Sequence, residues 1–345
     1  MIRLNELKMP LGATEQEVKT AVARALKIKE QDITDFSLAR RSIDSRKKDN
    51  IILVYSVDIE TSLNEEKVVA GFAPNKAFVT KRYKYELPEA KRSFPLRPVV
   101  AGFGPAGMFA ALTLAKAGLR PIVLERGSAV DERTRQVDTF WTNRKLNTES
   151  NVQFGEGGAG TFSDGKLNTL TKDKFNRCRY VFETFVECGA DKDIMISNMP
   201  HIGTDVLRNV VRNIRNKIID MGGEFRYNSC LTKINIVDNK VKSIEINNDE
   251  EIDVSVLVLA IGHSARDTFE MLKNVGLNME AKPFAVGIRI QHPQEIINVN
   301  QYGDGYYKEM GAASYKLTYK ASNGRGVYSF CMCPGGYVVN ASSED

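Results

Sequence analysis

Hydrophobic and polar positions in the first 92 residues predict a small α+β domain. Ile2 and Leu4 alternate with polar neighbours, which is the period of a short strand. Thr14 opens a capping-box arrangement with a glutamate three residues later, and apolar residues at helical spacing follow it. Residues 51–57 form a β-branched, apolar run typical of a strand. Residues 91–98 contain two prolines and three cations, which is typical of a linker.

The pattern changes at residue 99 to that of one βαβ unit. Residues 99–101 are a short apolar strand, residues 105–117 an apolar helix and residues 121–125 a second strand. A helix with one apolar face is expected over residues 205–221, where two glycines end it. Further strands are expected from short apolar runs at residues 231–237, 241–246, 254–261, 284–290, 315–319 and 327–333.

Composition places the chain among soluble globular proteins. It has 345 residues, 42% hydrophobic and 26% charged, which corresponds to two or three domains. The start of the chain lacks the pattern of a secretory signal, and no run of apolar residues is long enough to span a membrane. The five cysteines have no framework spacing. We therefore expect reduced thiols, a cytoplasmic protein and no membrane partner.

Positive charge is concentrated in the first quarter of the chain, within a net charge of +5. Residues 40–48 are its densest part. Such a run suits a nucleic-acid or acidic partner, or a solvated loop between two elements. Asp44 interrupts the run and no aromatic residue interleaves it, which favours the solvated loop and makes nucleic acid an unlikely partner.

The strongest chemical signal is a glycine turn between the strand at 99–101 and the helix behind it. Its glycines allow a tight turn, close approach of the backbone to a pyrophosphate and packing of the helix on the sheet. The free N–H groups of the helix start attract the phosphates. Glu125 ends the second strand, where a carboxylate binds ribose hydroxyls and disfavours a 2′-phosphate. This pattern does not separate NAD from FAD. The residues of the turn expected at the cofactor are Gly102, Gly104, Pro105, Ala106 and Gly107.

Two later segments favour a larger cofactor. Residues 154–166 are rich in glycine, so their amides can reach a phosphate or a flat ring; an ordinary mobile loop is the alternative. The strand at 254–261 ends in Ala-x-Gly, where FAD-binding chains return to the cofactor, although a plain buried strand has the same pattern. The further residues expected at the cofactor are Arg126, Arg133, Gly157, Gly158, Gly160, Leu231, Ala260 and Gly262.

Together, these motifs resemble the uncharacterised bacterial FAD-dependent dehydrogenases, a group of glutathione-reductase-type flavoproteins. The stretches that carry the resemblance are the glycine turn, Glu125-Arg126-Gly127, and residues 154–167, 260–267 and 329–336. The resemblance implies an α/β fold: a small N-terminal α+β domain (1–92), a Rossmann-like FAD-binding domain (97–275) and an inserted mixed-β substrate domain, here β-rich and partial (276–345).

One feature of that group is missing. Such flavoproteins close the FAD site with a late segment that carries a Gly-Asp pair near the flavin, and this chain stops just past the expected strands. The resemblance therefore predicts a C-terminally truncated member that keeps the adenosine half of the site.

Candidates for chemistry beyond the flavin are few. Lys166, beside Asp164, could stabilise negative charge on reduced flavin, and a solvated loop cation is the alternative. His263 and Arg266 follow the Ala-x-Gly strand end and could approach cofactor or substrate; a helix-capping surface pair is equally consistent. Cys331 and Cys333 lack the spacing of a redox or zinc motif, so we predict paired core cysteines and no metal.

The sequence thus predicts an FAD-dependent oxidoreductase that acts on an unidentified small molecule, with NAD(P)H as a possible electron donor. A non-catalytic FAD- or nucleotide-binding protein, an RNA-associated module using the basic N-terminal domain, and an NAD-only dehydrogenase remain alternatives.

Overall fold

A computed structural model gives the fold. It describes residues 1–91, 93–162, 165–167, 173–305, 310–329, 332–334 and 336–344.

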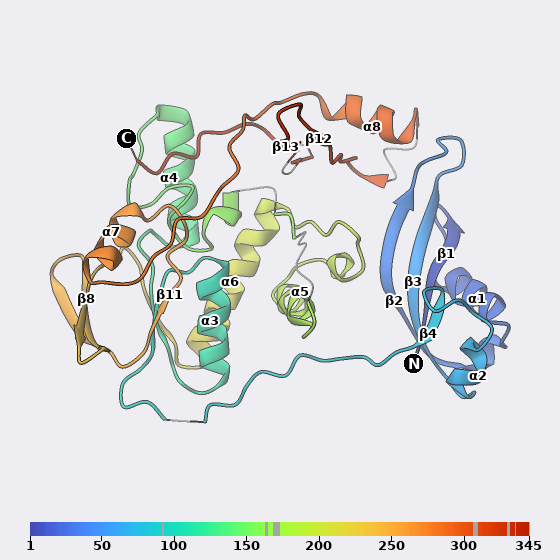
Figure 1. Cartoon of the computed structure of the whole chain (residues 1–345), viewed down its shortest axis with the longest axis horizontal. Coiled ribbons are helices and arrows are strands. Elements are labelled where there is room, and N and C mark those ends of the chain that lie inside the picture. Colours follow the sequence, from blue (N-terminus) through green and yellow to red (C-terminus); the bar gives the residue numbers. More distant parts are fainter. Residues whose placement is uncertain are drawn as a thin grey trace.

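The first 79 residues form a four-stranded antiparallel sheet with helices on one face, which we call the N-terminal unit (Figure 1). The strand order β2-β3-β1-β4 with two crossing helices is the split β-α-β, or ferredoxin-like, arrangement. Its elements are β1 (Ile2–Pro10), α1 (Glu15–Leu26), the 3₁₀ turn η1 (Glu30–Asp32), β2 (Ile33–Asp44), β3 (Ile52–Thr61), α2 (Glu65–Val69) and β4 (Ala77–Val79).

The alternating pattern of β1 and the capping box are both confirmed. Ile2 and Leu4 are buried against the apolar face of α1. At the start of α1 the Thr14 N–H donates to Glu17 Oε2 at 2.8 Å, and the Glu17 N–H donates to Thr14 Oγ1 at 3.3 Å. This exchange satisfies two amide groups that a helix start otherwise leaves without partners.

The second unit is built on a parallel Rossmann-like sheet, so the fold is α/β. Helix α3 (Pro105–Lys116) connects the first two strands of this sheet along the chain, which end at Ala101 and begin at Ile122, and packs against the sheet (Figure 1). The strand order is β11-β5-β6-β7, with β11 (Leu257–Leu259), β5 (Val99–Ala101), β6 (Ile122–Leu124) and β7 (Glu224–Arg226).

Both faces of the parallel sheet are covered, which explains why β5, β6 and β11 are apolar without alternation. Val100 and Val123 face one core, shared with α3, α5 (Arg177–Glu187) and α6 (Thr204–Asp220). Val99 and Ala101 face the opposite core. That core is closed by α7 (Arg266–Asn274) and an antiparallel meander of β8 (Leu231–Val237), β9 (Lys240–Ile246) and β10 (Glu250–Asp253).

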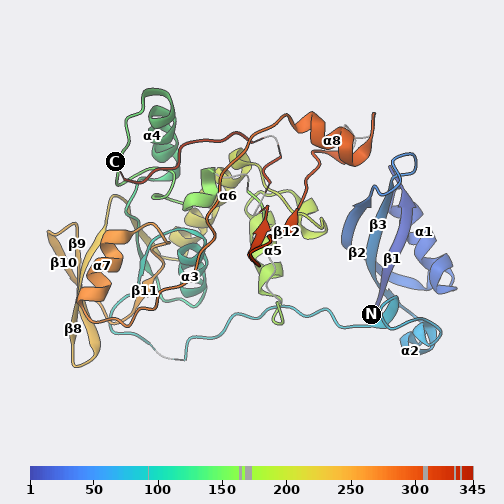
Figure 2. The same cartoon turned by 45° about the horizontal axis from the view of Figure 1, so that its top comes forward.

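The last part of the chain crosses back over the second unit. The end of the chain lies beside α4 (Val130–Asn143) in both views (Figures 1 and 2). There the Trp141 indole N–H donates to the Asn340 carbonyl at 2.9 Å. None of the helices in the described part of the chain has the length and apolarity to cross a membrane. The remaining elements are η2 (Ala159–Phe162), η3 (Lys192–Met195), α8 (Gln294–Tyr302), β12 (Thr318–Lys320) and β13 (Gly326–Tyr328).

The strand expected over residues 284–290 is not formed, so this prediction was wrong. The segment belongs to no strand of the described chain, and Phe284, Val286 and Ile288 are 84–90% exposed. Alternation makes a segment suitable for one face of a sheet, but a strand needs a partner strand for its hydrogen bonds. The strand expected over 327–333 is shorter, and Cys331 lies outside the described residues.

The basic run at residues 40–48 is only partly a loop, because β2 continues to Asp44. Arg41 pairs with the second unit: its N–H donates to the Ile196 carbonyl at 2.6 Å, and its carbonyl accepts the Asn198 N–H at 2.9 Å. Its guanidinium also lies 2.6 Å from Asp193. The edge of the N-terminal sheet is therefore covered by the second unit, and this pairing positions the two units.

Truncation of a core side chain in the N-terminal unit tests its packing. We expect Leu4→Ala to lower the free energy of unfolding by about 2–5 kcal/mol, because Leu4 is 1% exposed and the change leaves a cavity. Leu63→Ala, at a site that is 41% exposed, is the matched control. Chemical denaturation followed by circular dichroism measures both, and equal effects would contradict the described core.

Candidate functional site

The glycine turn after β5 is held in a conformation that only small residues permit. A Cβ atom on Gly107 would lie 1.8 Å from the Gly102 carbonyl oxygen, so the first turn of α3 touches the preceding strand end. The N-cap residue Gly104 has no side chain to cap α3, Pro105 has no N–H, and the first turn carries no acidic residue. The positive end of the α3 dipole therefore stays open for an anion.

Glu125 connects this turn to two other segments. Its carboxylate is 5% exposed and accepts three main-chain N–H groups: from Phe103 at 2.8 Å, from Gly127 at 3.0 Å and from Gly155 at 2.9 Å. A carboxylate offers about four acceptor positions, so about one remains. Glu125 thus fixes the geometry of the site, and it also lies on the wall of the cavity described below.

The glycine-rich segment packs directly on the glycine turn. The Gly157 N–H donates to the Phe103 carbonyl at 2.9 Å. Gly158 has φ +67°, and a Cβ there would lie 2.9 Å from the Gly104 Cα. The two glycine segments therefore form adjacent walls of one site.

Arg133 holds the glycine-rich segment from behind. Its fully buried guanidinium donates from all three nitrogens to carbonyls between Asn151 and Gly158, at 2.7–3.1 Å. Burial lowers its pKa to about 10, against the opposite effect of the Glu125 and Glu156 carboxylates, so the side chain stays charged at neutral pH. Arg133 shapes the segment and does not line the cavity.

Glu156 ties the same segment to two helices. Its buried carboxylate accepts the Val130 N–H of α4 at 2.7 Å and the Arg215 guanidinium of α6 at 2.9 Å. Burial raises its pKa, although Arg215 opposes the shift. The glycine-rich segment is therefore anchored on the side away from the glycine turn as well.

A cavity of about 680 Å³ lies at the carboxyl ends of β5, β6 and β11, and we call it the α3 cavity. It lies where sheets of this kind bind ligands, at the point where neighbouring strands connect in opposite directions. The sequence-predicted residues that line it are Gly102, Gly104, Pro105, Ala106, Glu125, Arg126, Gly158, Gly160, Leu231, Ala260, Gly262 and His263. Those that do not line it are Gly107, Arg133, Gly157, Lys166 and Arg266.

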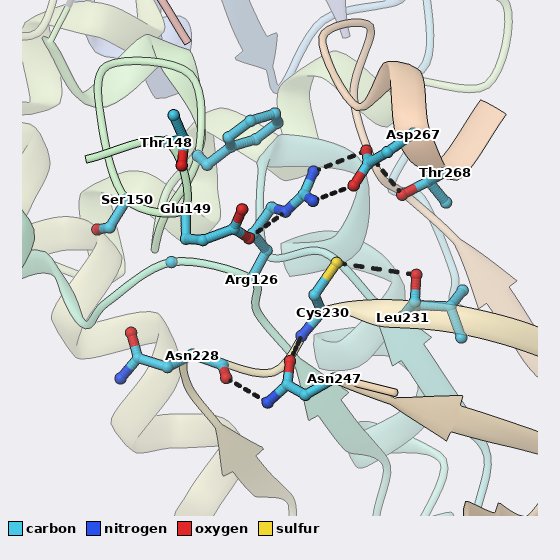
Figure 3. Close-up of polar contacts among 12 residues, drawn as sticks. Arg126, Thr148, Glu149, Ser150, Asn228, Cys230, Leu231, Asn247, Asp267 and Thr268 are labelled. Carbon is cyan, nitrogen blue, oxygen red and sulfur yellow. Dashed lines mark hydrogen bonds and ion pairs between the residues drawn. The ribbon is translucent and has the colours of Figure 1, made fainter. Parts of the chain in front are cut away.

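Arg126 closes one end of the α3 cavity by joining three segments (Figure 3). Its Nε donates to Glu149 Oε2 at 2.9 Å, and its Nη1 donates to Asp267 Oδ1, at the start of α7, at 2.9 Å. The guanidinium lies 4.7 Å from the centre of the Phe154 ring. Only 15% of the Arg126 side chain is exposed, so these contacts fix its position.

Cys230 stands beside Arg126 on the same wall (Figure 3). Its N–H donates to Asn247 Oδ1 at 2.8 Å, and its carbonyl accepts the Asn247 N–H at 2.9 Å. Burial raises the pKa of the thiol to about 11, while Arg126 lowers it and Asp267 raises it further. The thiol is therefore protonated and weakly nucleophilic at neutral pH.

His263 and Ser264 also line the α3 cavity, together with Gln153. The His263 Nδ1 lies 3.4 Å from Ser264 Oγ, and that hydroxyl donates to Gln153 Oε1 at 3.3 Å. Gln153 in turn donates to the Ala341 carbonyl at 3.2 Å. The end of the chain thus contacts this part of the site.

Two catalytic candidates lie away from the α3 cavity. Lys166 pairs in a β-bridge with His201. Arg266 is 64% exposed and pairs with Glu344 at 2.6 Å. Asp164 lies outside the described residues.

Several residues that line the α3 cavity were not predicted from the sequence. The turn from β7 into β8 and the first turns of α7 contribute side chains to the cavity without any local motif that marks them. The signals available were the expectation for Leu231, which follows this turn, and an apolar face on α7. These residues are Ser229, Cys230, Ser264, Ala265, Thr268, Phe269 and Leu272.

Comparison with known proteins gives matches at both ends of the chain. Residues 283–345 match a family described as FAD-dependent protein, C-terminal domain-like, and residues 1–60 match a domain of unknown function, DUF8436. An uncharacterized protein of Clostridium beijerinckii is 47% identical over 348 residues, which cover 100% of this chain and 64% of that protein. The chain therefore spans less than two thirds of the length of this curated relative.

Solved structures resemble about half of the chain. Thermovibrio ammonificans THI4 matches with a TM-score of 0.35 and 16% identity, over 52% of this chain and 62% of that chain. Lactococcus lactis thioredoxin reductase matches with a TM-score of 0.26 and 16% identity, over 47% and 33%. A complex of OTEMO with FAD and NADP matches with a TM-score of 0.31 and 16% identity, over 50% and 26%.

The environment of Cys230 predicts a pH-dependent reactivity. With a pKa of about 11, its alkylation by iodoacetamide should keep rising with pH above the range in which an ordinary thiol, with a pKa of about 8.5, has reached its plateau. Mass spectrometry of the Cys230 and Cys333 peptides measures both rates in one sample, since Cys333 is exposed. A plateau for Cys230 at or below that of Cys333 would contradict the buried environment.

Proposed function

We propose that this chain binds FAD in the α3 cavity and forms the cofactor-binding part of a flavin-dependent oxidoreductase acting on a small molecule. One observation carries the proposal: a single cavity of about 680 Å³ is lined by Glu125, by the start of α3 and by His263. A dinucleotide needs this sequence of a ribose acceptor, a phosphate site and space beyond it.

The start of α3 suits the pyrophosphate. Pro105 and Ala106 line the cavity at a helix start with no acidic residue in its first turn. Gly104 and Gly158 approach so closely that a side chain on Gly158 would close the space between them. Main-chain amides at the start of α3 can therefore come near phosphate oxygens, with Gly158 leaving room for them.

The end at Glu125 suits the adenosine. About one acceptor position of the Glu125 carboxylate is left for a ribose hydroxyl after its three main-chain bonds. Leu231, Phe269 and Leu272 supply apolar surface there for a flat base. The Arg126 ion pairs close this end of the site.

The opposite end favours FAD over NAD alone. The cavity includes Gln153, Gly160 and His263 beyond the phosphate position, so two glycine segments and a strand end surround the ligand. The match of residues 283–345 to a family described as FAD-dependent supports the same choice.

Bound FAD would supply hydride and electron transfer through its isoalloxazine ring. Residues of the chain then orient the cofactor and move protons. His263 is the best placed of the three catalytic candidates, because it alone lines the cavity, and its Nδ1 is within reach of Ser264. We assign it the exchange of a proton or hydrogen bond at the flavin end. Lys166 and Arg266 rank behind it.

NADH or NADPH is the electron donor we propose, with a small molecule as the substrate.

An RNA-associated role gains no support from the N-terminal unit. RNA-binding sheets of this topology use aromatic residues on the open face to stack bases. Here that face is opposed by residues 194–200 of the second unit, and Phe78 is the aromatic residue it contributes to the space between them.

A charge placed at the start of α3 tests the cofactor site. We expect the protein to take up FAD and show visible flavin bands after dialysis. Ala106→Glu should weaken FAD binding about tenfold or more, because a carboxylate there repels the pyrophosphate while it stabilises the helix start. Ala106→Gln, similar in size and neutral, is the matched control and should bind FAD more tightly than Ala106→Glu. Fluorescence titration of FAD measures both affinities.

Three results would count against the proposal: no retained flavin, equal affinities of the two Ala106 variants, or alkylation of Cys230 that FAD does not slow. Anaerobic addition of NADH or NADPH to the FAD-loaded protein then tests turnover. Bleaching of the flavin bands is expected, and bands that persist with both donors would reject a nicotinamide donor.

A further inference from the structure

A second cavity lies between the N-terminal unit and the second unit, and we call it the sheet cleft. Its volume is about 430 Å³, within the range of small-molecule sites. The floor is the open face of the N-terminal sheet, opposite its helices. The opposing wall is formed by α5, Leu167 and residues 194–200. In Figure 1 this face is turned toward α5 and the chain segment that follows it, and β2 is the strand drawn nearest to them.

Hydrogen bonds, an ion pair and apolar packing hold the parts of the chain around the sheet cleft. Along one side, Arg41 of β2 forms two main-chain hydrogen bonds and an ion pair with residues 193–198. Near the β2–β3 loop, Ile51 packs with Tyr302 of α8 in a small apolar cluster. Gln301 of α8 also donates to Ser45 Oγ at 2.8 Å. The N-terminal unit is thus joined to the second unit at Arg41 and to the C-terminal segment at α8.

The floor offers positive charge and polar donors. Arg3 donates from Nε and Nη2 to the Asp58 carboxylate, at 2.6 and 2.7 Å, so its charge is balanced. Arg40 reaches across the cleft to Asn198 Oδ1, a neutral partner. Among the described residues that line the cleft, these two arginines carry charge, so the net charge left on the lining is close to +1. Asn5 and Ser56 add neutral polar groups.

The opposing wall is of mixed polarity, because Ser197 and Asn198 lie among its apolar residues. Leu167, Phe182, Ile194 and Pro200 line it, and Phe78 extends the apolar surface at the edge of the floor. A ligand with a short apolar body can therefore contact these apolar side chains while it presents an anionic group to Arg40. A single uncompensated charge suits a monoanion better than a dianion such as phosphate.

We propose that the sheet cleft binds a small carboxylic acid with an apolar body, whose carboxylate pairs with Arg40. Binding sites of small molecules commonly lie at the boundary between two structural units. A carboxylate accepts two parallel N–H groups from a guanidinium, which gives the pairing direction as well as energy. This site is separate from the α3 cavity and does not depend on the identity of the cofactor.

Benzoate is the probe, and Cys178 is the reporter, because Cys178 lines the sheet cleft. The intact chain is saturated with FAD and titrated calorimetrically with benzoate, with benzamide and with inorganic phosphate. We expect saturable binding of benzoate, weaker binding of the other two, and slower alkylation of Cys178 by iodoacetamide as the cleft fills. Cys230, in the α3 cavity, should show no effect of benzoate.

Arg40→Gln should weaken benzoate binding about tenfold, the value of one charge-assisted hydrogen bond. Arg46→Gln is the matched control: Arg46 lies six residues further along, is 84% exposed and does not line the cleft, so its loss should leave benzoate affinity unchanged. Circular dichroism of both variants checks that they fold.

Absence of saturable benzoate binding, or equal affinity of wild type and Arg40→Gln, would overturn the proposal. Tighter binding of phosphate than of benzoate would overturn the assignment to a carboxylic acid. If benzoate slows the alkylation of Cys230 and not of Cys178, benzoate binds in the α3 cavity and the proposal for the sheet cleft is wrong. The flavin bands show independently whether FAD is bound. If FAD does not bind, the alkylation rate of Cys178 still reports whether benzoate fills the sheet cleft.

Discussion

The site depends on one buried carboxylate. Glu125 accepts N–H groups from Phe103, Gly127 and Gly155. These residues belong to the glycine turn, to the turn directly after Glu125 and to the glycine-rich segment. Without the carboxylate, three buried donors would lose their partner, and each such loss costs about 1–3 kcal/mol. The carboxylate therefore sets the relative position of the glycine turn and the glycine-rich segment, and the α3 cavity exists between them because of it.

A second layer of polar contacts makes this arrangement rigid. Arg133 fills the space behind the glycine-rich segment. It donates hydrogen bonds to main-chain carbonyls that would otherwise be buried without donors. Glu156 adds bonds to α4 and α6. Several carbonyl groups of the segment thus accept from Arg133, while the N–H groups of Gly155 and Gly157 bond to Glu125 and Phe103. The shape of the segment is therefore set by contacts within the protein before any ligand is present.

Sequence patterns between neighbouring residues were sufficient to predict the starts of two helices, α1 and α3. The capping box at Thr14 and the glycine turn before α3 each rest on residues close in sequence, so they could be predicted. Arg133 was expected at the cofactor, yet a cation near a glycine-rich segment gives no indication of which side it occupies. Cys230 was missed because α7 and the meander bring it to the cavity through long-range packing. The strand at 284–290 failed for a related reason, since pairing depends on a partner that the segment's own pattern does not specify.

The exposed segment at 284–290 has a consequence for how the molecule meets other chains. Its main-chain N–H and C=O groups have no sheet partner in the described structure, and Phe284, Val286 and Ile288 present a continuous apolar row. An extended segment of this kind is a template to which another strand can add along its whole length. Arg41 shows the contrasting case, because the edge it belongs to is already occupied. Residues 284–290 therefore offer an exposed apolar surface that a second chain could cover.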